Sequence, residues 1–138
     1  MKINLKIIKN LSDFDYIRKL RNTSYVRLNS LNKKIISKVE HQNWLRKNKS
    51  NQFFTLKESN KNIGYIRIDK NYYVSWALEK NYWGKIKFYE YLKKATGNKK
   101  ITYKCIILNN NIRSQINALK AGFFVFNVNK KKIFLKKN

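Results

Sequence analysis

Residues 74–88 have the sequence VSWALEKNYWGKIKF, an apolar strand followed by a short polar connector and a predicted helix that Gly84 opens. A helix N-terminus favours an anion, because its first N–H groups are unpaired and the helix dipole is positive there. Lys85 and Lys87 add positive charge at this point. The stretch therefore predicts a phosphate-binding turn, although bulky Ile86 and Phe88 stand where glycine usually lets a phosphate approach the backbone.

Length and composition indicate one domain, covering residues 1–138, with one core. The chain has 138 residues and 43% hydrophobic content, which is enough to bury about two thirds of the unfolded surface. It has no run of 18 apolar residues, and its first six residues alternate polar and apolar side chains. We therefore expect a cytoplasmic protein without a signal peptide or membrane span. Cys105 lies in an apolar run, which favours a buried hydrophobe over a disulfide or a catalytic thiol, and we expect no metal site.

The formal net charge of +25 has two explanations. A charge of this size is typical of proteins that bind nucleic acid or an anionic membrane. The abundance of Lys, Asn, Ile, Tyr and Phe, with no Pro, is also what an A/T-rich genome would produce, and the lysines are spread along the whole chain. Under either explanation the positive field attracts anionic ligands.

Hydrophobic periodicity and turn residues divide the chain into strands and helices. The predicted strands span residues 3–7, 52–57, 63–68, 72–78, 102–108, 123–128 and 132–135. The predicted helices span about 14–22 after a Ser12-Asp13 cap, 37–48 with a capping box of Ser37 and Glu40, 84–95, and 112–121. Short turns join the three middle strands, which indicates antiparallel hairpins. This order predicts an α+β fold with a mixed sheet covered by helices.

Two patterns in this order resemble the GNAT superfamily of acyl-coenzyme A dependent N-acyltransferases, over essentially the whole chain. The first is residues 74–88, where the family has its central strand, a connector and the pyrophosphate loop. The second and stronger is NIRSQINALKAGF at residues 111–123, which matches the family's late helix of the form Asn-x-x-Ser followed by Lys-x-Gly-Phe. The resemblance implies a mixed, mostly antiparallel twisted sheet of about seven strands flanked by about four helices.

The resemblance also implies acetyl coenzyme A as co-substrate. The main-chain N–H of Leu78 would face the thioester carbonyl, a contact that contributes about 3 to 4 kcal/mol in acyl transfer. The family's loop has Arg or Gln at the place of Trp83, Gly at the place of Ile86, and Gly or Ala at the place of Phe88. If Ile86 or Phe88 had to adopt a left-handed backbone, the conformational cost would be about 1 to 2 kcal/mol. The implied donor-binding residues are Leu78, Lys80, Trp83, Gly84, Lys85, Ile86, Lys87, Phe88, Asn111 and Ser114.

A narrower resemblance is to the branch that acetylates nucleotide-linked amino sugars in pathways to pseudaminic and legionaminic acids and other surface polysaccharides. It rests on residues 20–30, 40–45 and 63–69. Arginines would bind the nucleotide diphosphate, since a guanidinium makes bidentate contacts with phosphate oxygens, and aromatic rings would stack on sugar or base. The implied acceptor-binding residues are Arg21, Asn22, Arg27, Trp44, Tyr65, Arg67 and Trp76. Taken singly, each has an ordinary structural explanation as a core aromatic, a solvated charge or a strand residue.

Acyl transfer to an amine needs a group that accepts the amine proton. The candidates are Glu79 and Asp69, which lie at strand ends, and His41, the chain's one imidazole. A base acting through water is a further possibility. The family's late-helix Tyr, which protonates the departing thiolate, is replaced by Ala118, so another tyrosine, Ser114 or solvent must take this role.

The sequence therefore predicts an N-acetyltransferase that uses acetyl coenzyme A, with a nucleotide-linked amino sugar as the first candidate acceptor. A protein or ribosomal amine is a second candidate within the same fold. A catalytically reduced module that binds nucleic acid through its positive surface is the alternative from another functional class.

Overall fold

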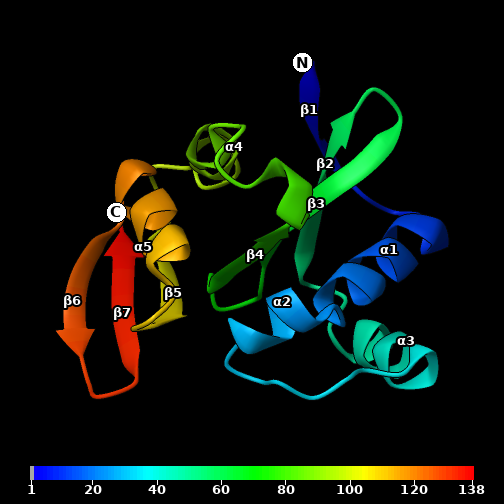
Figure 1. Cartoon of the computed structure of the whole chain (residues 1–138), viewed down its shortest axis with the longest axis horizontal. Helices are drawn as coiled ribbons and strands as arrows, with labels where there is room; N and C mark the ends of the chain where they lie inside the picture. The colour runs from blue at the N-terminus through cyan, green and yellow to red at the C-terminus, as the bar shows by residue number, and fades with distance from the viewer. Residues whose placement is uncertain (1) are drawn as a thin grey trace.

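The computed structural model describes residues 2–138, which form seven strands and five α-helices (Figure 1). The strands are β1 (Ile3–Ile7), β2 (Gln52–Glu58), β3 (Lys61–Ile68), β4 (Val74–Leu78), β5 (Tyr103–Leu108), β6 (Phe124–Val128) and β7 (Lys132–Lys137). The helices are α1 (Leu11–Arg21), α2 (Ser24–Leu28), α3 (Lys38–Lys47), α4 (Phe88–Ala95) and α5 (Ile112–Lys120), with a 3₁₀ turn, η1 (Lys80–Tyr82), after β4. The predicted α+β architecture with seven strands is confirmed.

The strands form two antiparallel sheets that separate between β4 and β5. One has the order β1-β2-β3-β4, and the other has the order β5-β7-β6. Between β4 and β5 the contact is a single parallel bridge, Tyr73 with Lys104, where the Lys104 N–H donates to the Tyr72 carbonyl at 3.0 Å. Beyond this bridge the two strands diverge, and Figure 1 shows α5 beside β5 at this divergence.

The core has two parts, which place the helices on the sheets. The larger part contains β2, β3, β5 and β7 side chains together with Phe88 and Leu92 from α4 and Ala118 from α5. The smaller part joins α1 and α2 to β2–β4 through residues such as Ile17 and Leu20. Burial of these apolar faces holds α1, α2 and α3 near β4, in the lower right of Figure 1.

Three predicted features differ from the structure. Helix α1 starts at Leu11, not near Phe14, because the side chain of Asn10 accepts from the Asp13 N–H and takes the capping role expected of Ser12-Asp13. Helix α2 was not predicted, because its five residues are too short for a periodic pattern. Helix α4 starts at Phe88 instead of Gly84, because Gly84 has a left-handed φ of 74° that a helix does not continue through.

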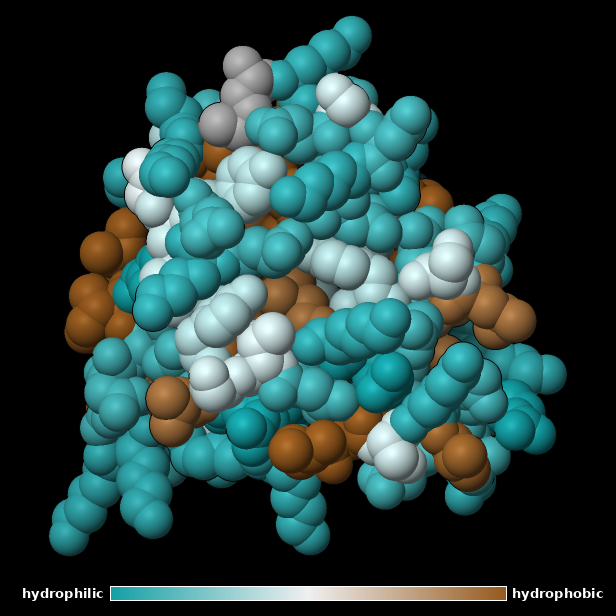
Figure 2. All heavy atoms as spheres, turned by 45° about the vertical axis from the view of Figure 1, so that its right-hand side comes forward, coloured by the Kyte–Doolittle hydropathy of each residue, from teal (hydrophilic) through white to brown (hydrophobic). Residues whose placement is uncertain are grey.

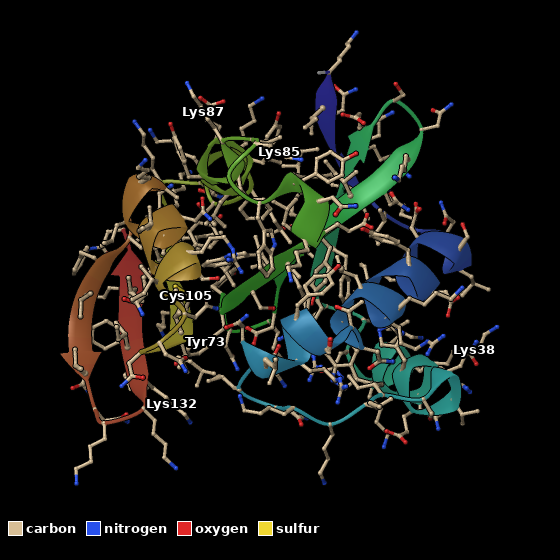
Figure 3. All side chains as sticks on the ribbon, in the orientation of Figure 1. Lys38, Tyr73, Lys85, Lys87, Cys105 and Lys132 are labelled. Atoms are coloured by element: carbon tan, nitrogen blue, oxygen red, sulfur yellow. The ribbon has the colours of Figure 1, made fainter. Side chains whose placement is uncertain are left out.

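Positive side chains are distributed over the whole surface. In Figure 3 the labelled Lys38 and Lys132 lie far from each other and from the neighbouring Lys85 and Lys87. On the face that Figure 2 shows, hydrophilic side chains cover most of the surface and apolar ones form small separate groups. Among residues 2–138 no helix is both long and apolar enough to cross a membrane. Cys105 is buried, as predicted, and burial raises the pKa of its thiol to about 12.

Candidate functional site

The divergence of β4 from β5 leaves backbone amides of β4 facing the gap. The Glu79 N–H donates to the Ile63 carbonyl at 2.9 Å and the Asp69 N–H donates to the Tyr73 carbonyl at 3.0 Å, so odd-numbered residues of β4 make the ladder with β3. In an antiparallel pair the intervening residues point their N–H and C=O groups to the opposite side. The N–H groups of Trp76 and Leu78 are therefore directed to the side where β5 has moved away.

A cavity of about 500 Å³ opens in this gap. Its walls come from β4, β5, α1, the segment after α2, and the start of α3. Trp44, Phe53, Tyr65 and Trp76 supply aromatic surface, and Asn111 and Ser114 come from the start of α5. The predicted residues Arg21, His41, Trp44, Tyr65, Arg67 and Trp76 all line this one cavity.

Two arginines in the cavity have buried nitrogens with no hydrogen-bond partner. These are Nη1 of Arg21 and Nε of Arg67. Arg21 uses one other nitrogen to bond the Asn32 carbonyl, whereas Arg67 lies over the Trp44 ring with its guanidinium carbon 5.3 Å from the ring centroid. Burial lowers the pKa of Arg21, and nearby Arg27 and Arg67 lower it further. A buried guanidinium nitrogen without an acceptor on each of two half-buried arginines favours an anion at this point of the cavity.

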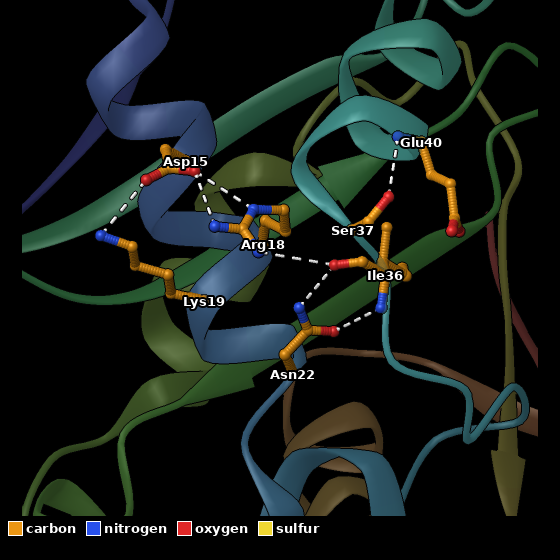
Figure 4. Close-up of polar contacts among 7 residues, drawn as sticks. All are labelled: Asp15, Arg18, Lys19, Asn22, Ile36, Ser37 and Glu40. Carbon is orange, nitrogen blue, oxygen red and sulfur yellow. Dashed lines mark hydrogen bonds and ion pairs between the residues drawn. The ribbon is translucent and has the colours of Figure 1, made fainter.

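A network of polar contacts fixes the α1 and α3 side of the cavity (Figure 4). Arg18 pairs with Asp15 at 3.0 Å and reaches the Ile36 carbonyl. The Asn22 side chain accepts from the Ile36 N–H at 2.8 Å and donates to the Ile36 carbonyl at 2.7 Å, and Ser37 caps α3 as predicted. These bonds hold the segment that joins α2 to α3 against α1.

Two predicted acceptor residues therefore serve the frame of the cavity instead of lining it. Asn22 uses both polar atoms of its side chain on Ile36. Arg27 donates to the carbonyls of Asn22 and Lys33 in the same segment. Neither side chain lines the cavity, because both are committed to local backbone groups.

The three candidate bases lie in different places. His41 lines the cavity, is buried, and stacks parallel to Trp44 with ring centroids 6.1 Å apart. Burial lowers its pKa, and Arg18 lowers it further, while Asp15 acts in the opposite direction. The Glu79 carboxylate accepts from the Tyr16 hydroxyl at 3.0 Å, and burial together with this carboxylate raises the pKa of Tyr16.

Asp69, the third candidate base, lies far from Glu79 along the sheet. In the antiparallel β3–β4 pair the two residues fall at opposite ends, since Gly64 pairs with Leu78 and Ile68 with Val74. The Asp69 carboxylate accepts from the N–H groups of Asn71 and Tyr73 and thereby holds the turn. Its role is structural, as Asp commonly has in such turns.

A second, smaller cleft of about 60 Å³ lies at the end of β4. It is lined by five of the predicted donor-binding residues, Leu78, Trp83, Phe88, Asn111 and Ser114. It shares Trp76, Asn29, Ser30, Asn111 and Ser114 with the large cavity. Trp83 is held by its indole N–H, which donates to the Leu78 carbonyl at 2.9 Å, and by the edge-on ring of Tyr25 at 5.5 Å.

The loop before α4 differs from the prediction. Ile86 and Phe88 have no left-handed backbone, so the expected strain is absent, and the positive φ falls on Gly84, next to Trp83. Phe88 is 2% exposed and packs on Trp76, and Ile86 also packs on the core. Lys85 and Lys87 are exposed on this loop (Figure 3). Helical N–H groups do not begin at Gly84 as expected, since the Lys85 N–H donates to the Tyr82 carbonyl.

Sequence reasoning missed Tyr25, Ser30 and Arg113 among the residues of the small cleft, and also Tyr16, which lies outside the lining of both cavities. Tyr25, Ser30 and Arg113 line the small cleft, and Tyr16 bonds Glu79. Arg113 lies inside the quoted 111–123 pattern, where attention to the one arginine of that helix would have identified it. Tyr16 and Tyr25 carry no local signal, because they reach the site only through the packing of α1 and α2 on β4.

No protein-family model and no curated protein matches the chain. Solved structures do match it over nearly its full length. A domain from Methanocaldococcus jannaschii DSM 2661 has a TM-score of 0.81 and 18% identity, covering 99% of this chain and 98% of its own. Spermidine N-acetyltransferase from Vibrio cholerae, in complex with CoA and spermine, has a TM-score of 0.79 and 11% identity, with 97% and 93% covered.

Ribosomal-protein-S5-alanine acetyltransferase from Vibrio fischeri is similar with a TM-score of 0.75 and 16% identity, covering 98% of this chain and 92% of its own. These likenesses, together with the diverging β4 and β5, establish the GNAT fold that the sequence predicts.

Proposed function

We propose that this protein is an N-acetyltransferase that moves an acetyl group from acetyl coenzyme A to a primary amine on an anionic small molecule, with a nucleotide-linked amino sugar as the first candidate. The observation that carries the proposal is the pair of buried, unpartnered guanidinium nitrogens of Arg21 and Arg67 in the large cavity. Fold neighbours bound to CoA support the choice of donor.

The two cavities would hold the two substrates. The donor arm would enter through the small cleft at Leu78 and Trp83, and the amine would occupy the large cavity. The amine attacks the thioester carbonyl, the C–S bond breaks, and the thiolate leaves with a proton. The main-chain N–H of Leu78 is the donor for the carbonyl oxygen. The main-chain N–H of Trp76 lies about 7 Å farther back along the strand and is available to a second acceptor on the donor arm.

His41 is the better placed of the candidate bases. It lines the cavity, and its lowered pKa keeps the imidazole neutral and able to accept a proton near pH 7. Glu79 is engaged by the Tyr16 hydroxyl and lies outside the cavity lining. The hydroxyls of Ser114 and Tyr25, which line the small cleft, are the candidates to protonate the thiolate in place of the family's Tyr.

The charges in the cavity favour an acceptor that carries negative charge as well as its amine. Arg18, Arg21 and Arg67 line it, with Glu40 as the one carboxylate among the described lining residues. A polyamine, the acceptor named for the Vibrio cholerae neighbour, would bring further positive charge to these arginines. A phosphate or carboxylate would instead satisfy the buried guanidinium nitrogens.

The test combines thermal unfolding with thiol release. Acetyl coenzyme A should raise the melting temperature, and a nucleoside-diphosphate-linked amino sugar should release free thiol faster than the same sugar without its nucleotide or than spermidine. If millimolar acetyl coenzyme A does not change the melting temperature, the proposed acetyltransferase activity is contradicted. Equal rates with the free sugar would contradict the anionic acceptor.

The +25 charge favours a second candidate, a nucleic-acid-binding module of the same fold, and the 60 Å³ size of the donor cleft agrees with it. Such a module would bind RNA or DNA with an affinity that falls steeply as salt rises. Absence of binding to a mixed-sequence oligonucleotide at low salt would eliminate this candidate.

A further inference from the structure

The loop that should hold the donor phosphates has no arginine. Its first motif place is Trp83, and the next two, Ile86 and Phe88, are committed to the core. Lys85 and Lys87 are exposed lysines, which are flexible, hydrated point charges. The first turn of α4 also contains Glu90, a carboxylate that opposes an anion there. A bidentate phosphate contact must therefore come from another element.

Arg113, in the first turn of α5, lies directly beside this loop. Its guanidinium carbon is 3.2 Å from the centroid of the Trp83 ring, and it lines the small cleft. Trp83 is itself fixed by its bond to the Leu78 carbonyl and by Tyr25. The arginine is thus held on a rigid platform at the end of β4.

The guanidinium of Arg113 has donors but no acceptor. Within residues 2–138 it donates no hydrogen bond and joins no ion pair, whereas Arg18, Arg21, Arg27 and Arg46 each bond at least one oxygen. The side chain is half-buried, and burial lowers its pKa. Stacking uses the flat face of a guanidinium and leaves its N–H groups, which lie in the plane, available for a planar bidentate contact.

We propose that Arg113, held on Trp83, binds the diphosphate of the acyl donor and replaces the arginine or glutamine that the loop lacks. This inference rests on the proposed function, since it assumes that the small cleft receives acetyl coenzyme A. The guanidinium comes from α5 instead of the loop, and the ring of Trp83 holds it in place. The guanidinium forms two parallel N–H to oxygen bonds with the phosphates, as in other Arg–phosphate pairs.

Calorimetric titration with three probes tests this assignment. The probes are CoA, dephospho-CoA, which keeps the diphosphate, and pantetheine, which has the same thiol-bearing arm without phosphates. Arg113→Ala should weaken CoA and dephospho-CoA binding by about 10-fold to 100-fold, the range for hydrogen bonds to charged groups, and leave pantetheine unchanged. Arg113→Lys should recover only part of the loss, because it restores the charge without the planar fork.

Further variants separate the contribution of the Trp83 ring from that of the Arg113 charge. Trp83→Phe keeps an aromatic face and should bind CoA better than Trp83→Ala, which should resemble Arg113→Ala. Arg46→Ala, on the exposed face of α3, removes the same charge away from both cavities and is the matched control. Thermal unfolding of each variant shows that the fold is retained.

The outcomes distinguish this inference from the proposed function. If the wild-type protein binds neither CoA nor pantetheine, the proposed function fails and Arg113 loses its assigned ligand. If the wild-type protein binds CoA and Arg113→Ala binds it equally well or more tightly, the assignment of Arg113 is overturned. The proposed acetyltransferase function is not affected by that result. Equal losses for CoA and pantetheine would also overturn it, since they would show a role in shaping the cleft.

Discussion

The large cavity and the small cleft both contain an arginine stacked on a tryptophan, Arg67 on Trp44 and Arg113 on Trp83. Among the described residues, these are the two arginines that donate no hydrogen bond from the side chain. The surroundings differ. Hydrogen bonds between α1 and the segment before α3 hold the large cavity open at about 500 Å³, whereas apolar packing of the α4 loop leaves about 60 Å³ in the cleft.

This difference shows two ways of presenting a cation to a ligand. On the acceptor side the polar frame consists of a helix cap that spans 3 residues and a side-chain bond from Asn22 to Ile36 that spans 14. On the donor side Ile86 and Phe88 of the loop pack into the core, and the arginine beside the loop comes from α5.

Replacing Phe88 by Ala should cause the largest loss, about 3 to 5 kcal/mol in the free energy of unfolding. Phe88 is 2% exposed and fills the core beside Trp76, so the substitution leaves a cavity under the donor loop. Chemical denaturation measures the loss, with the half-exposed Phe126→Ala on β6 as control. A Phe88→Ala protein of unchanged stability would show that the loop is not anchored by packing.

Replacing Arg67 by Ala should raise the KM for the acceptor by about 10-fold to 100-fold and leave the Kd for CoA unchanged. The reason is that Arg67 presents a buried, unpartnered nitrogen to the large cavity only. Steady-state kinetics and titration separate the two quantities. A similar loss of CoA binding would show that Arg67 does not act on the acceptor alone, and would contradict separate acceptor and donor sites.

Asn22→Ala should destabilise the frame of the large cavity by about 1 to 2 kcal/mol, because two hydrogen bonds to the Ile36 backbone are lost. Thermal unfolding gives the value, and Asn43→Ala, at an exposed position on α3, is the control. CoA binding should not change. A normal melting temperature would mean that the frame does not depend on this clamp.

His41 should give the smallest effect, a dependence of stability on pH. Its pKa is lowered in the folded protein, so the unfolded chain, titrating near 6.5, binds the proton more readily. Stability is then fully present above about pH 6.5 and is lost as pH falls through the lowered pKa of the folded state. His41→Gln should reduce the change of the unfolding free energy with pH between pH 7.5 and 5. If the pH dependence is the same in this variant, another group causes it.

Local patterns predicted most of the fold, because strand alternation, the Ser37 cap and the Gly122 helix end are set by neighbouring residues. The start of α4 was not predicted, because the left-handed backbone of Gly84 and the burial of Phe88 both depend on how the loop packs on the core. Spacing and resemblance identified five acceptor-binding residues and the candidate base His41 that the structure brings together in one cavity. Local patterns could not predict the contacts of Trp83 with Tyr25 and Arg113, because the three residues lie on separate elements. The sequence placed Asp69 at a strand end without regard to strand direction. Because β3 and β4 are antiparallel, their C-terminal ends lie at opposite edges, so Asp69 and Glu79 are far apart.

The single bridge between β4 and β5 also determines how fast individual amides of β4 exchange with solvent deuterium. Ser75, Ala77 and Glu79 donate into the ladder with β3, whereas Trp76 and Leu78 point into the divergence. Protection should therefore alternate from one residue to the next within a single strand, with slow exchange at the odd positions and fast exchange at the even ones. A bound thioester should slow exchange at the even positions and leave the odd ones as they were.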